Sequence, residues 1–451
     1  MVTKAQLARL GLFDAKVPRY TSYPTAPHFS DATGPAHFTR WVSEIAPGSR
    51  ISIYLHVPFC RRLCWFCACR TQGTKTLAPV AAYVETLKTE LAMLAAILPA
   101  GITLSRLHWG GGTPTLLDAG LITDLAGALR AALPFAPDYE FSVEIDPNEI
   151  DAPRLDALAA AGMNRASVGV QDFDPDIQQS IGRIQGFDIT RDAIRAIRGR
   201  GIGSLNADIL YGLPHQTPAR MTDSVQKLLS LNPDRVALYG YAHVPWMSKR
   251  QQLIPADKLP TPQERLTLFE TARKLFEWDG YDAIGIDHFA RPGDGLARAL
   301  QAGRLRRNFQ GYTDDPAQIL IGLGASAISR FPQGYAQNAT ATRSYSSEIR
   351  DGRFATKRGH AFTGDDLIRA RMIETLMCEF RISIRDLCTR FRGRRATVNT
   401  ILQNLNASFP GLLHLGDEGL FVPAAARPLT RMIARQIDAY EMDSAGHSAA
   451  I

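Results

Sequence analysis

The chain has 451 residues, with 51 Lys or Arg against 44 Asp or Glu, which gives a formal net charge of +7. A hydrophobic fraction of 45% suits a globular protein, and no run of about 18 apolar residues predicts a membrane span. Six cysteines in this length exclude a disulfide scaffold, and the first residues lack the apolar core of a signal peptide, so we expect a cytoplasmic protein.

The first 48 residues are expected to form an N-terminal arm. Its central stretch, "VPRYTSYPTAPHFSD", contains three prolines, each of which disfavours helix at the residue before it. The arm should therefore be extended and should not fold as a compact unit.

From Ile51 onward, strand patterns and helix patterns alternate. In "ISIYLHV", apolar residues alternate with Ser52, Tyr54 and His56, which predicts a strand with one apolar and one polar face. Further strands are expected near residues 104–110, 139–146, 164–171, 203–212, 234–241 and 281–289. Helices are expected near residues 80–98, 116–133, 152–161, up to 200, 220–231 and 262–280. At least six strand-then-helix units predict an α/β domain over residues 49–350, built as an open parallel sheet or as a closed or partial barrel.

Polar residues gather where the predicted strands end. They are His56, Glu144, Asp146, Gln171, Asp208 and Tyr241. In barrels and in open parallel sheets alike, this edge carries the active site, so function should lie there.

In residues 351–451, strand patterns no longer alternate with helix patterns. Helix patterns over residues 363–383, 384–391 and 395–405 precede a hairpin pattern around Gly416–Gly419. We expect a mostly helical, winged-helix-like C-terminal domain.

The segment "HVPFCRRLCWFCACR" carries Cys60, Cys64, Cys67 and Cys69 in the spacing C-x3-C-x2-C-x-C. In a reducing compartment such a cluster predicts metal or redox chemistry. Zinc usually takes two pairs of ligands set apart in sequence, and the C-x-C end is cramped for a tetrahedral site. A short loop with several thiolates suits an iron–sulfur cluster better, and zinc stays the alternative.

This loop resembles the cluster loop of radical S-adenosylmethionine (SAM) enzymes. The resemblance implies that Cys60, Cys64 and Cys67 hold a four-iron, four-sulfur cluster whose fourth iron binds SAM. Cys69 is then no ligand. In that superfamily, reductive cleavage of SAM yields a 5′-deoxyadenosyl radical that abstracts hydrogen from the substrate.

The resemblance is closer to one family. Over about residues 18–380, the chain is similar to the oxygen-independent coproporphyrinogen III oxidases. The motifs are "PRYTSYPTA", "YLHVPFC", "LCWFCAC", "GGGTPT", "EIDP", "GVQDF", "DILYGLP", "YAHVP", "DHFARP", "NFQGYT" and "YAQN". One departure is "CACRT", where some members carry a Gly and an Asn-Lys pair, and it touches no expected ligand.

The family resemblance implies a reaction. Two propionates of coproporphyrinogen III lose carbon dioxide and become vinyl groups, which gives protoporphyrinogen IX in haem biosynthesis. One SAM is spent for each propionate, a flavodoxin-type or ferredoxin-type protein reduces the cluster, and the final electron acceptor is unknown. The basic balance suits a substrate with four carboxylates.

Site residues follow from the same resemblance. The residues expected to bind SAM are Tyr54, Phe66, Gly111, Gly112, Thr113, Glu144, Gln171, Arg183, Asp208, Ala242 and Ile328, with Gln171, Arg183 and Asp208 around a second SAM. His56 and Cys69 are candidate catalytic residues, and Arg19, His288 and Arg291 are weaker substrate candidates. Taken singly, each has a structural explanation: a tight turn, a helix cap, a solvated helix or core packing.

Two rival functions are open. One is a haem chaperone or haem-utilising relative with the same barrel and cluster, against which the fourth cysteine and the arm argue. The other is a zinc module on nucleic acid, for which no dense basic recognition helix stands out. We expect a monomer without nucleic-acid partners.

Overall fold

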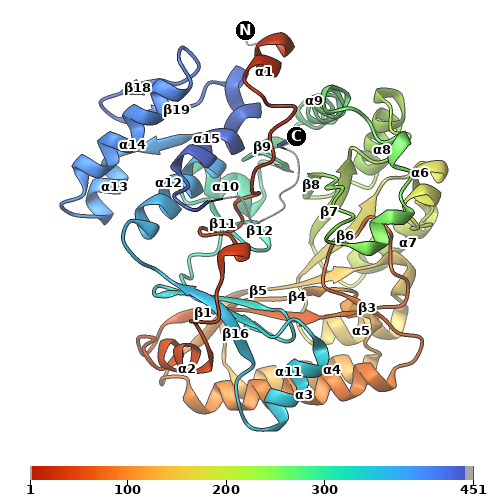
Figure 1. The fold of residues 1–451 in the computed structure, drawn as a ribbon. Helices are drawn as coiled ribbons and strands as arrows, with labels where there is room; N and C mark the ends of the chain where they lie inside the picture. Colours follow the sequence, from red (N-terminus) through yellow and green to blue (C-terminus); the bar gives the residue numbers. More distant parts are fainter. Residues whose placement is uncertain (1–2, 442–449) are drawn as a thin grey trace.

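The computed structural model describes residues 3–441 and 450–451. At its centre lies one mixed sheet of twelve strands in the order β16-β15-β14-β13-β1-β4-β5-β6-β7-β8-β10-β9 (Figure 1). Its six central strands are parallel: β1 (Arg50–Val57), β4 (Thr103–Gly111), β5 (Phe135–Ile145), β6 (Arg165–Gln171), β7 (Ser204–Tyr211) and β8 (Arg235–Gly240). The predicted α/β architecture is confirmed.

Both edges of the sheet are antiparallel, which the sequence patterns did not predict. The single strand expected over residues 281–289 is wrong: the structure has β9 (Asp282–Ile284) and β10 (His288–Ala290), paired antiparallel. Gly285, at a φ of +56°, lies in the turn between them. At the other edge, β13 (Leu320–Leu323) is parallel to β1, and β14 (Ile328–Phe331), β15 (Gly334–Asn338) and β16 (Thr356–Ala361) follow antiparallel.

Helices cover the outer face of the parallel strands. They are α3 (Ala78–Ile97), α4 (Ala119–Ala132), α5 (Ala152–Ala160), α6 (Pro175–Ser180), α7 (Phe187–Arg198), α8 (Pro218–Ser230) and α9 (Pro262–Trp278). Their ends follow ordinary capping chemistry: the Asp118 side chain accepts from the Leu121 N–H at 2.8 Å, and Thr261 with Glu264 forms a capping box. On α7, the buried Ala193, Ile194 and Ile197 follow helical spacing toward the sheet.

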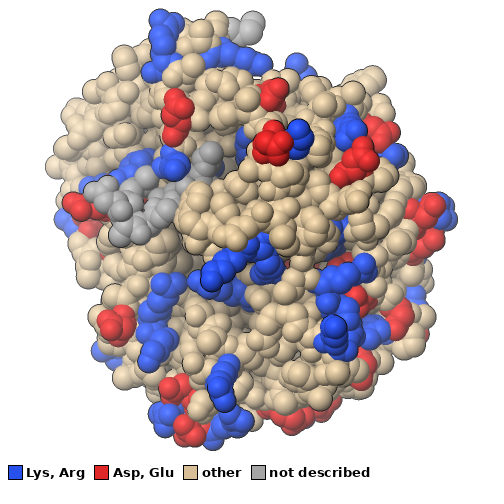
Figure 2. Space-filling view, turned by 45° about the vertical axis from the view of Figure 1, so that its right-hand side comes forward, with Lys and Arg blue, Asp and Glu red and all other residues tan. Residues whose placement is uncertain are grey.

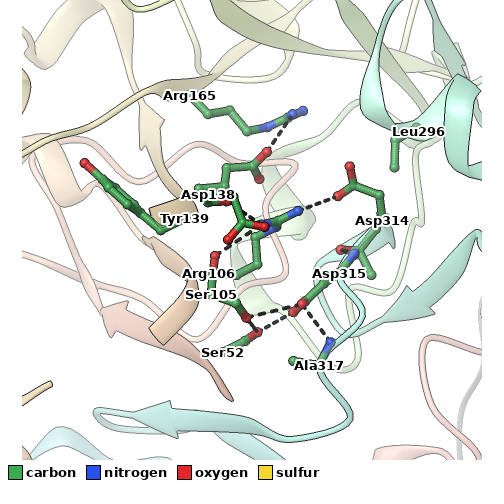
Figure 3. Close-up of polar contacts among 12 residues, drawn as sticks. Ser52, Ser105, Arg106, Asp138, Tyr139, Arg165, Leu296, Asp314, Asp315 and Ala317 are labelled. Atoms are coloured by element: carbon green, nitrogen blue, oxygen red, sulfur yellow. Dashed lines mark hydrogen bonds and ion pairs between the residues drawn. The ribbon is translucent and has the colours of Figure 1, made fainter. Parts of the chain in front are cut away.

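Every second side chain of each strand points inward, and many of these side chains are polar, so the inner face of the sheet is polar. These side chains line a cavity of about 220 Å³. At the N-terminal ends of the strands the cavity is filled by paired charges (Figure 3). Arg106 Nη2 lies 3.2 Å from Asp314 Oδ1, and Arg165 Nη1 lies 3.5 Å from Glu140 Oε2. Asp315 accepts from Ser52 and from the Ala317 N–H. Charges this deep need such partners.

The C-terminal region and the N-terminal arm share one hydrophobic core. The region holds α12 (Asp366–Glu379), α13 (Ile384–Arg390), α14 (Arg395–Ser408) and α15 (Thr430–Ile437), with a small sheet of β17 (Arg381–Ser383), β19 (Gly419–Phe421) and β18 (His414–Gly416). Leu12 and Val17 of the arm are buried in the same cluster as Met372, Leu376 and Ile433. The arm is extended over much of its length, as expected, but includes α1 (Lys4–Arg9) and the unpredicted α2 (Pro35–Ser43).

Shorter elements complete the chain: β2 (Phe59–Cys60), β3 (Gln72–Gly73), α10 (Gly295–Gln301), β11 (Arg306–Asn308), β12 (Gly311–Thr313) and α11 (Thr342–Arg350). Within the described ranges, no helix combines the length and the apolar character that a membrane crossing requires.

Candidate active site

The cysteine loop joins β2 to β3 directly after the central strand β1. Cys60, Cys64 and Cys67 are half-buried, Cys69 is exposed, and all four thiols are free. The loop is held from behind by the segment after β8: the Ser248 hydroxyl donates to the Cys67 carbonyl at 3.1 Å, and Gln251 Nε2 donates to the Phe66 carbonyl at 2.7 Å. The thiols are therefore held at the C-terminal end of the parallel strands.

Hydrogen-bond donors face the cysteine sulfurs. Arg183 Nη1 lies 3.6 Å from Cys64 Sγ, and the Cys69 N–H lies 3.4 Å from Cys67 Sγ. The hydrogen bond with the Cys69 thiol lowers the pKa of Cys67 to about 6, whereas burial raises the pKa of Cys60 to about 11 and also raises the pKa of Cys64. A cysteine binds a metal as its thiolate, and donors to sulfur are typical of iron–sulfur sites. Such donors face Cys64 and Cys67, and this geometry fits a cluster.

The alternative to a cluster is a single bound metal ion. Over the part of the chain that the structure describes, no three His, Cys, Asp or Glu side chains converge as one ion requires. An iron–sulfur cluster presents several irons, and each thiolate binds a different one.

The glycine loop after β4 is packed against both the cysteine loop and a carboxylate. A Cβ on Gly110 would lie 2.6 Å from Glu144 Oε1, and one on Gly112 would lie 2.5 Å from the Phe59 carbonyl and 3.0 Å from Cys60 Sγ. Larger residues have no room here. Residues 110–112 must therefore be glycine for the cysteine loop and Glu144 to approach this closely.

The amides of the glycine loop already donate to acceptors within the protein. The Gly111 N–H donates to Glu144 Oε2 at 3.1 Å, the Gly112 N–H to the Val57 carbonyl at 2.8 Å, and the Thr113 N–H to the Phe59 carbonyl at 2.8 Å. The loop can instead offer carbonyl oxygens, which suit an ammonium group.

Glu144 is held ionised by a histidine that the sequence reasoning missed. His108 Nε2 lies 3.2 Å from Glu144 Oε1, and the His108 ring stacks on Tyr54 with centroids 5.7 Å apart. Burial opposes ionisation, yet the His108 and Gly111 hydrogen bonds hold the pKa of Glu144 below its ordinary value. Tyr54 in turn contacts His56 Nδ1 at 2.9 Å, and burial lowers the pKa of His56.

Arg183 and Asp208 form the other side of the site. Arg183 Nη2 donates to the Gly169 carbonyl at 3.1 Å, and Nη1 lies 3.3 Å from Asp146 Oδ2. Asp208 lines the same cavity as Glu144 and accepts from Asn206 Nδ2 at 2.9 Å, and burial raises the pKa of Asp208 to about 6.

The remaining candidates are arranged less tightly. Gln171 takes a φ of +69°, and its amide would lie 3.1 Å from a Cβ on Gly169. The carbonyls of Phe66 and Ala242 both accept from Gln251 Nε2, so these two residues lie side by side. Ile328 begins β14, two strands from β1 in the sheet.

The three weaker substrate candidates, Arg19, His288 and Arg291, do not lie at one place in the structure. His288 lines the cavity, and Arg19 Nη2 donates to the Gly240 carbonyl at 2.6 Å, at the end of β8. The expectation for Arg291 is wrong. β10 runs antiparallel to β8, so the chain leads Arg291 to the N-terminal end of that strand, where its guanidinium bonds Asp279 and Asn232.

Several cavity residues escaped the sequence reasoning, namely His108, Ser167, Asn206 and Tyr239. Alternation within a strand could have found three of them, because Ser167, Asn206 and Tyr239 lie an even number of positions from Gln171, Asp208 and Tyr241. His108 is placed by its pairing with Tyr54 in the sheet, which only the structure shows.

Comparisons with known proteins agree with this geometry. The model of the radical SAM superfamily matches residues 54–228. The chain is 62% identical to the oxygen-independent coproporphyrinogen III oxidase of Paracoccus denitrificans (strain Pd 1222), over all of both chains, and 58% identical to that of Cereibacter sphaeroides, over 98% of both. A solved structure described as coproporphyrinogen III oxidase (HemN) from Escherichia coli, a radical SAM enzyme, superposes with a TM-score of 0.89 at 37% identity, covering 95% of this chain and 100% of that one.

Proposed function

The chain belongs to the oxygen-independent coproporphyrinogen III oxidase family of the radical SAM superfamily, and from this premise we propose how its residues serve the reaction. It is a radical SAM oxidoreductase of haem biosynthesis that acts on coproporphyrinogen III without oxygen. In the proposed reaction, two propionates lose carbon dioxide and become vinyl groups, which gives protoporphyrinogen IX.

Cys60, Cys64 and Cys67 hold the four-iron, four-sulfur cluster in this proposal. The observation that carries it is the set of half-buried thiols beside the Glu144 cavity, with Arg183 and the Cys69 N–H directed at two of the sulfurs. The cluster and SAM, when bound, supply a 5′-deoxyadenosyl radical that takes hydrogen from the substrate.

Glu144 and the glycine loop bind the first SAM. A carboxylate kept ionised by His108 attracts a cationic or hydroxyl-bearing ligand, and the loop carbonyls accept from an ammonium group. Tyr54, beside His108, provides an aromatic face near that site. Burial lowers the pKa of His56, which favours its neutral form, and we propose that it accepts or passes on a proton.

A second SAM is bound by Gln171, Arg183 and Asp208, one molecule for each propionate. Arg183 can hold a carboxylate and Asp208 can accept from ribose hydroxyls. Because Arg183 also lies within 3.6 Å of Cys64 Sγ, this set borders the cluster site directly. Phe66, Ala242 and Ile328 are proposed as further walls around the cofactors.

We propose that the sheet and helices form a partial (β/α)6 barrel, followed by a winged-helix-like C-terminal domain. The three helices α12–α14 and the hairpin β18–β19 support this description. The domain shares its core with the arm, so the two together form a cover over the barrel.

The cluster must be reduced by a partner, which we propose is an acidic protein of the flavodoxin or ferredoxin type. Arg62, Arg70, Lys75 and Lys249 are exposed around the cysteine loop. Lysine and arginine side chains gather near the middle of the face shown in Figure 2. A basic rim favours encounter with an acidic partner. The enzyme is proposed to work as a cytoplasmic monomer.

The test is an anaerobic assay of reconstituted enzyme with dithionite, SAM and coproporphyrinogen III, followed by mass spectrometry. Formation of 5′-deoxyadenosine and loss of two carbon dioxide units are expected. The Cys64→Ala variant should lose the cluster and both products, and Cys388→Ala, changed outside the loop, should keep them. SAM cleavage with intact porphyrinogen would favour a haem-handling relative, and a colourless zinc protein would contradict the cluster.

A further inference from the structure

A second cavity of about 230 Å³ lies outside the barrel cavity. It is enclosed by the arm near Tyr20–Tyr23, by β11, by β14 and the start of β15, and by α12 with the residues after α13. Asn308 on β11 lines both cavities, so β11 is their common wall. In Figure 1 the arm passes directly over β11 and β12 on its way to the sheet.

The cavity contains one carboxylate, and both of its oxygens are bonded. Arg306 Nε donates to Glu374 Oε1 at 2.8 Å, and Arg371 Nη1 donates to Glu374 Oε2 at 3.0 Å. Arg371 also donates to Asp386 Oδ2 at 2.8 Å, and Arg390 donates to Asp386 Oδ1 at 2.8 Å. The acidic groups nearby are therefore fully engaged.

One guanidinium in the cavity has no hydrogen-bond acceptor. Arg330 lies in the field of Glu374, but it donates no hydrogen bond to any residue in the described parts of the chain. Five arginines line the cavity (Arg306, Arg307, Arg330, Arg371 and Arg390). Among the described residues, three carboxylates pair with them, Glu374, Asp386 and Asp287, so the arginines outnumber these partners by two. Such a site favours an anionic ligand.

The rest of the wall is aromatic. Tyr335 stands edge-on to Phe309, with centroids 5.4 Å apart, and edge-on to Phe362, with centroids 5.3 Å apart. Tyr23 and Phe391 also line the cavity. Aromatic side chains favour an apolar ring, and an unpaired guanidinium favours the planar carboxylate beside it. A small, strongly hydrated anion would leave these rings unused.

We propose that this cavity binds a pyrrole ring of a tetrapyrrole by its propionate side chain, with Arg330 donating to the carboxylate. The cavity is too small for a whole macrocycle, so it takes one edge and leaves the rest outside. The inference rests on the proposed function, because it assumes a tetrapyrrole ligand. That ligand is either the substrate, held by a propionate that does not react, or a later haem-pathway tetrapyrrole.

Fluorescence titration of the anaerobic holoenzyme with coproporphyrin III, the stable oxidised form of the substrate ring, tests the site. Arg330→Gln should weaken binding by about tenfold, which is the loss of one charge-assisted hydrogen bond. Arg330→Lys should restore part of the affinity. Arg353→Gln, which removes an exposed arginine paired with Glu348, is the matched control and should bind as the wild type does.

A second variant and a second readout keep the result clear. Leu367 lines the cavity and is 44% exposed, so Leu367→Trp should narrow the entrance and weaken binding without disturbing the fold. Formation of 5′-deoxyadenosine without porphyrinogen should be unchanged in the Arg330 variants. If the wild type fails to cleave SAM, the proposed function is wrong. The titration with coproporphyrin III measures binding in the cavity independently of SAM cleavage, so it still tests this proposal.

Parallel titration with haem distinguishes the two sources. Tighter, Arg330-dependent binding of coproporphyrin III assigns the cavity to the substrate, and tighter, Arg330-dependent binding of haem assigns it to a later tetrapyrrole. Equal affinities of the wild type, Arg330→Gln and Leu367→Trp for both ligands would overturn the proposal.

Discussion

Replacing His108 by phenylalanine isolates the hydrogen bond that keeps Glu144 ionised. Phenylalanine retains the stacked contact with Tyr54, now 5.7 Å between ring centroids, and removes only the 3.2 Å bond from Nε2 to Glu144 Oε1. A hydrogen bond to a charged group contributes about 1.5–3 kcal/mol. Glu144 would keep the bond from the Gly111 N–H but lose its second donor.

The expected result is a pH-dependent loss of SAM affinity. The pKa of Glu144 is now held below its ordinary value, so the carboxylate is ionised across the neutral range. Without His108, burial is opposed by one bond fewer and the pKa rises, so the neutral acid accumulates as the pH falls. SAM should bind roughly tenfold or more weakly at low pH, and the deficit should shrink as the pH rises.

Equilibrium dialysis of SAM against the reconstituted enzyme, from about pH 6 to about pH 9, measures this directly. His108→Gln keeps an N–H donor at a similar reach and should retain most of the affinity. If His108→Phe binds SAM like the wild type at every pH, then either His108 does not support Glu144 or Glu144 does not hold SAM, and the reasoning is refuted.

Three further predictions follow from other contacts. In Gly112→Ala, the new Cβ would lie 2.5 Å from the Phe59 carbonyl, so β2 must move. We expect the free energy of unfolding to fall by about 1–3 kcal/mol and the iron content per chain to be lower. The control Gly127→Ala, on α4 with nothing near the new Cβ, should keep its iron. Arg183→Met removes a positive charge that lies 3.6 Å from Cys64 Sγ and stabilises the reduced cluster. If the reduced cluster loses about 1.4 kcal/mol of stabilisation, an EPR-monitored redox titration should show a potential lower by about 59 mV. An unchanged potential would mean that the contact is absent in the holoenzyme. Asp208→Asn concerns a carboxyl group whose pKa burial raises from 3.8 to about 6, so the stability of the neutral form is present below pH 3.8 and lost as the pH rises through about 6. At pH 8 the variant should therefore be more stable than the wild type by about 1–2 kcal/mol and unfold at a higher temperature, while losing activity. Equal melting temperatures at pH 8 would contradict the burial argument.

Local patterns in the sequence predicted most of the strands and helices. Alternation in "ISIYLHV" identified β1 and its polar inner face, and the glycine loop and cysteine loop followed at the expected strand ends. These features depend on neighbours within a few residues, so a short window of sequence contains their cause. The hairpin of β9 and β10 was missed because its turn depends on Gly285 lying against Tyr312, 27 residues further on.

The cysteine spacing and the chain-wide motifs were sufficient, by themselves, to indicate the cofactor chemistry and the family. The tertiary structure alone decided which polar groups meet. His108 supports Glu144, Arg183 reaches Cys64 across 119 positions, and Arg307 donates to the Tyr20 carbonyl across 287 positions. Such contacts arise from sheet order and from packing of the arm, which no local pattern encodes. The same physical reason explains why Arg330 and its aromatic cavity are visible only in the folded chain.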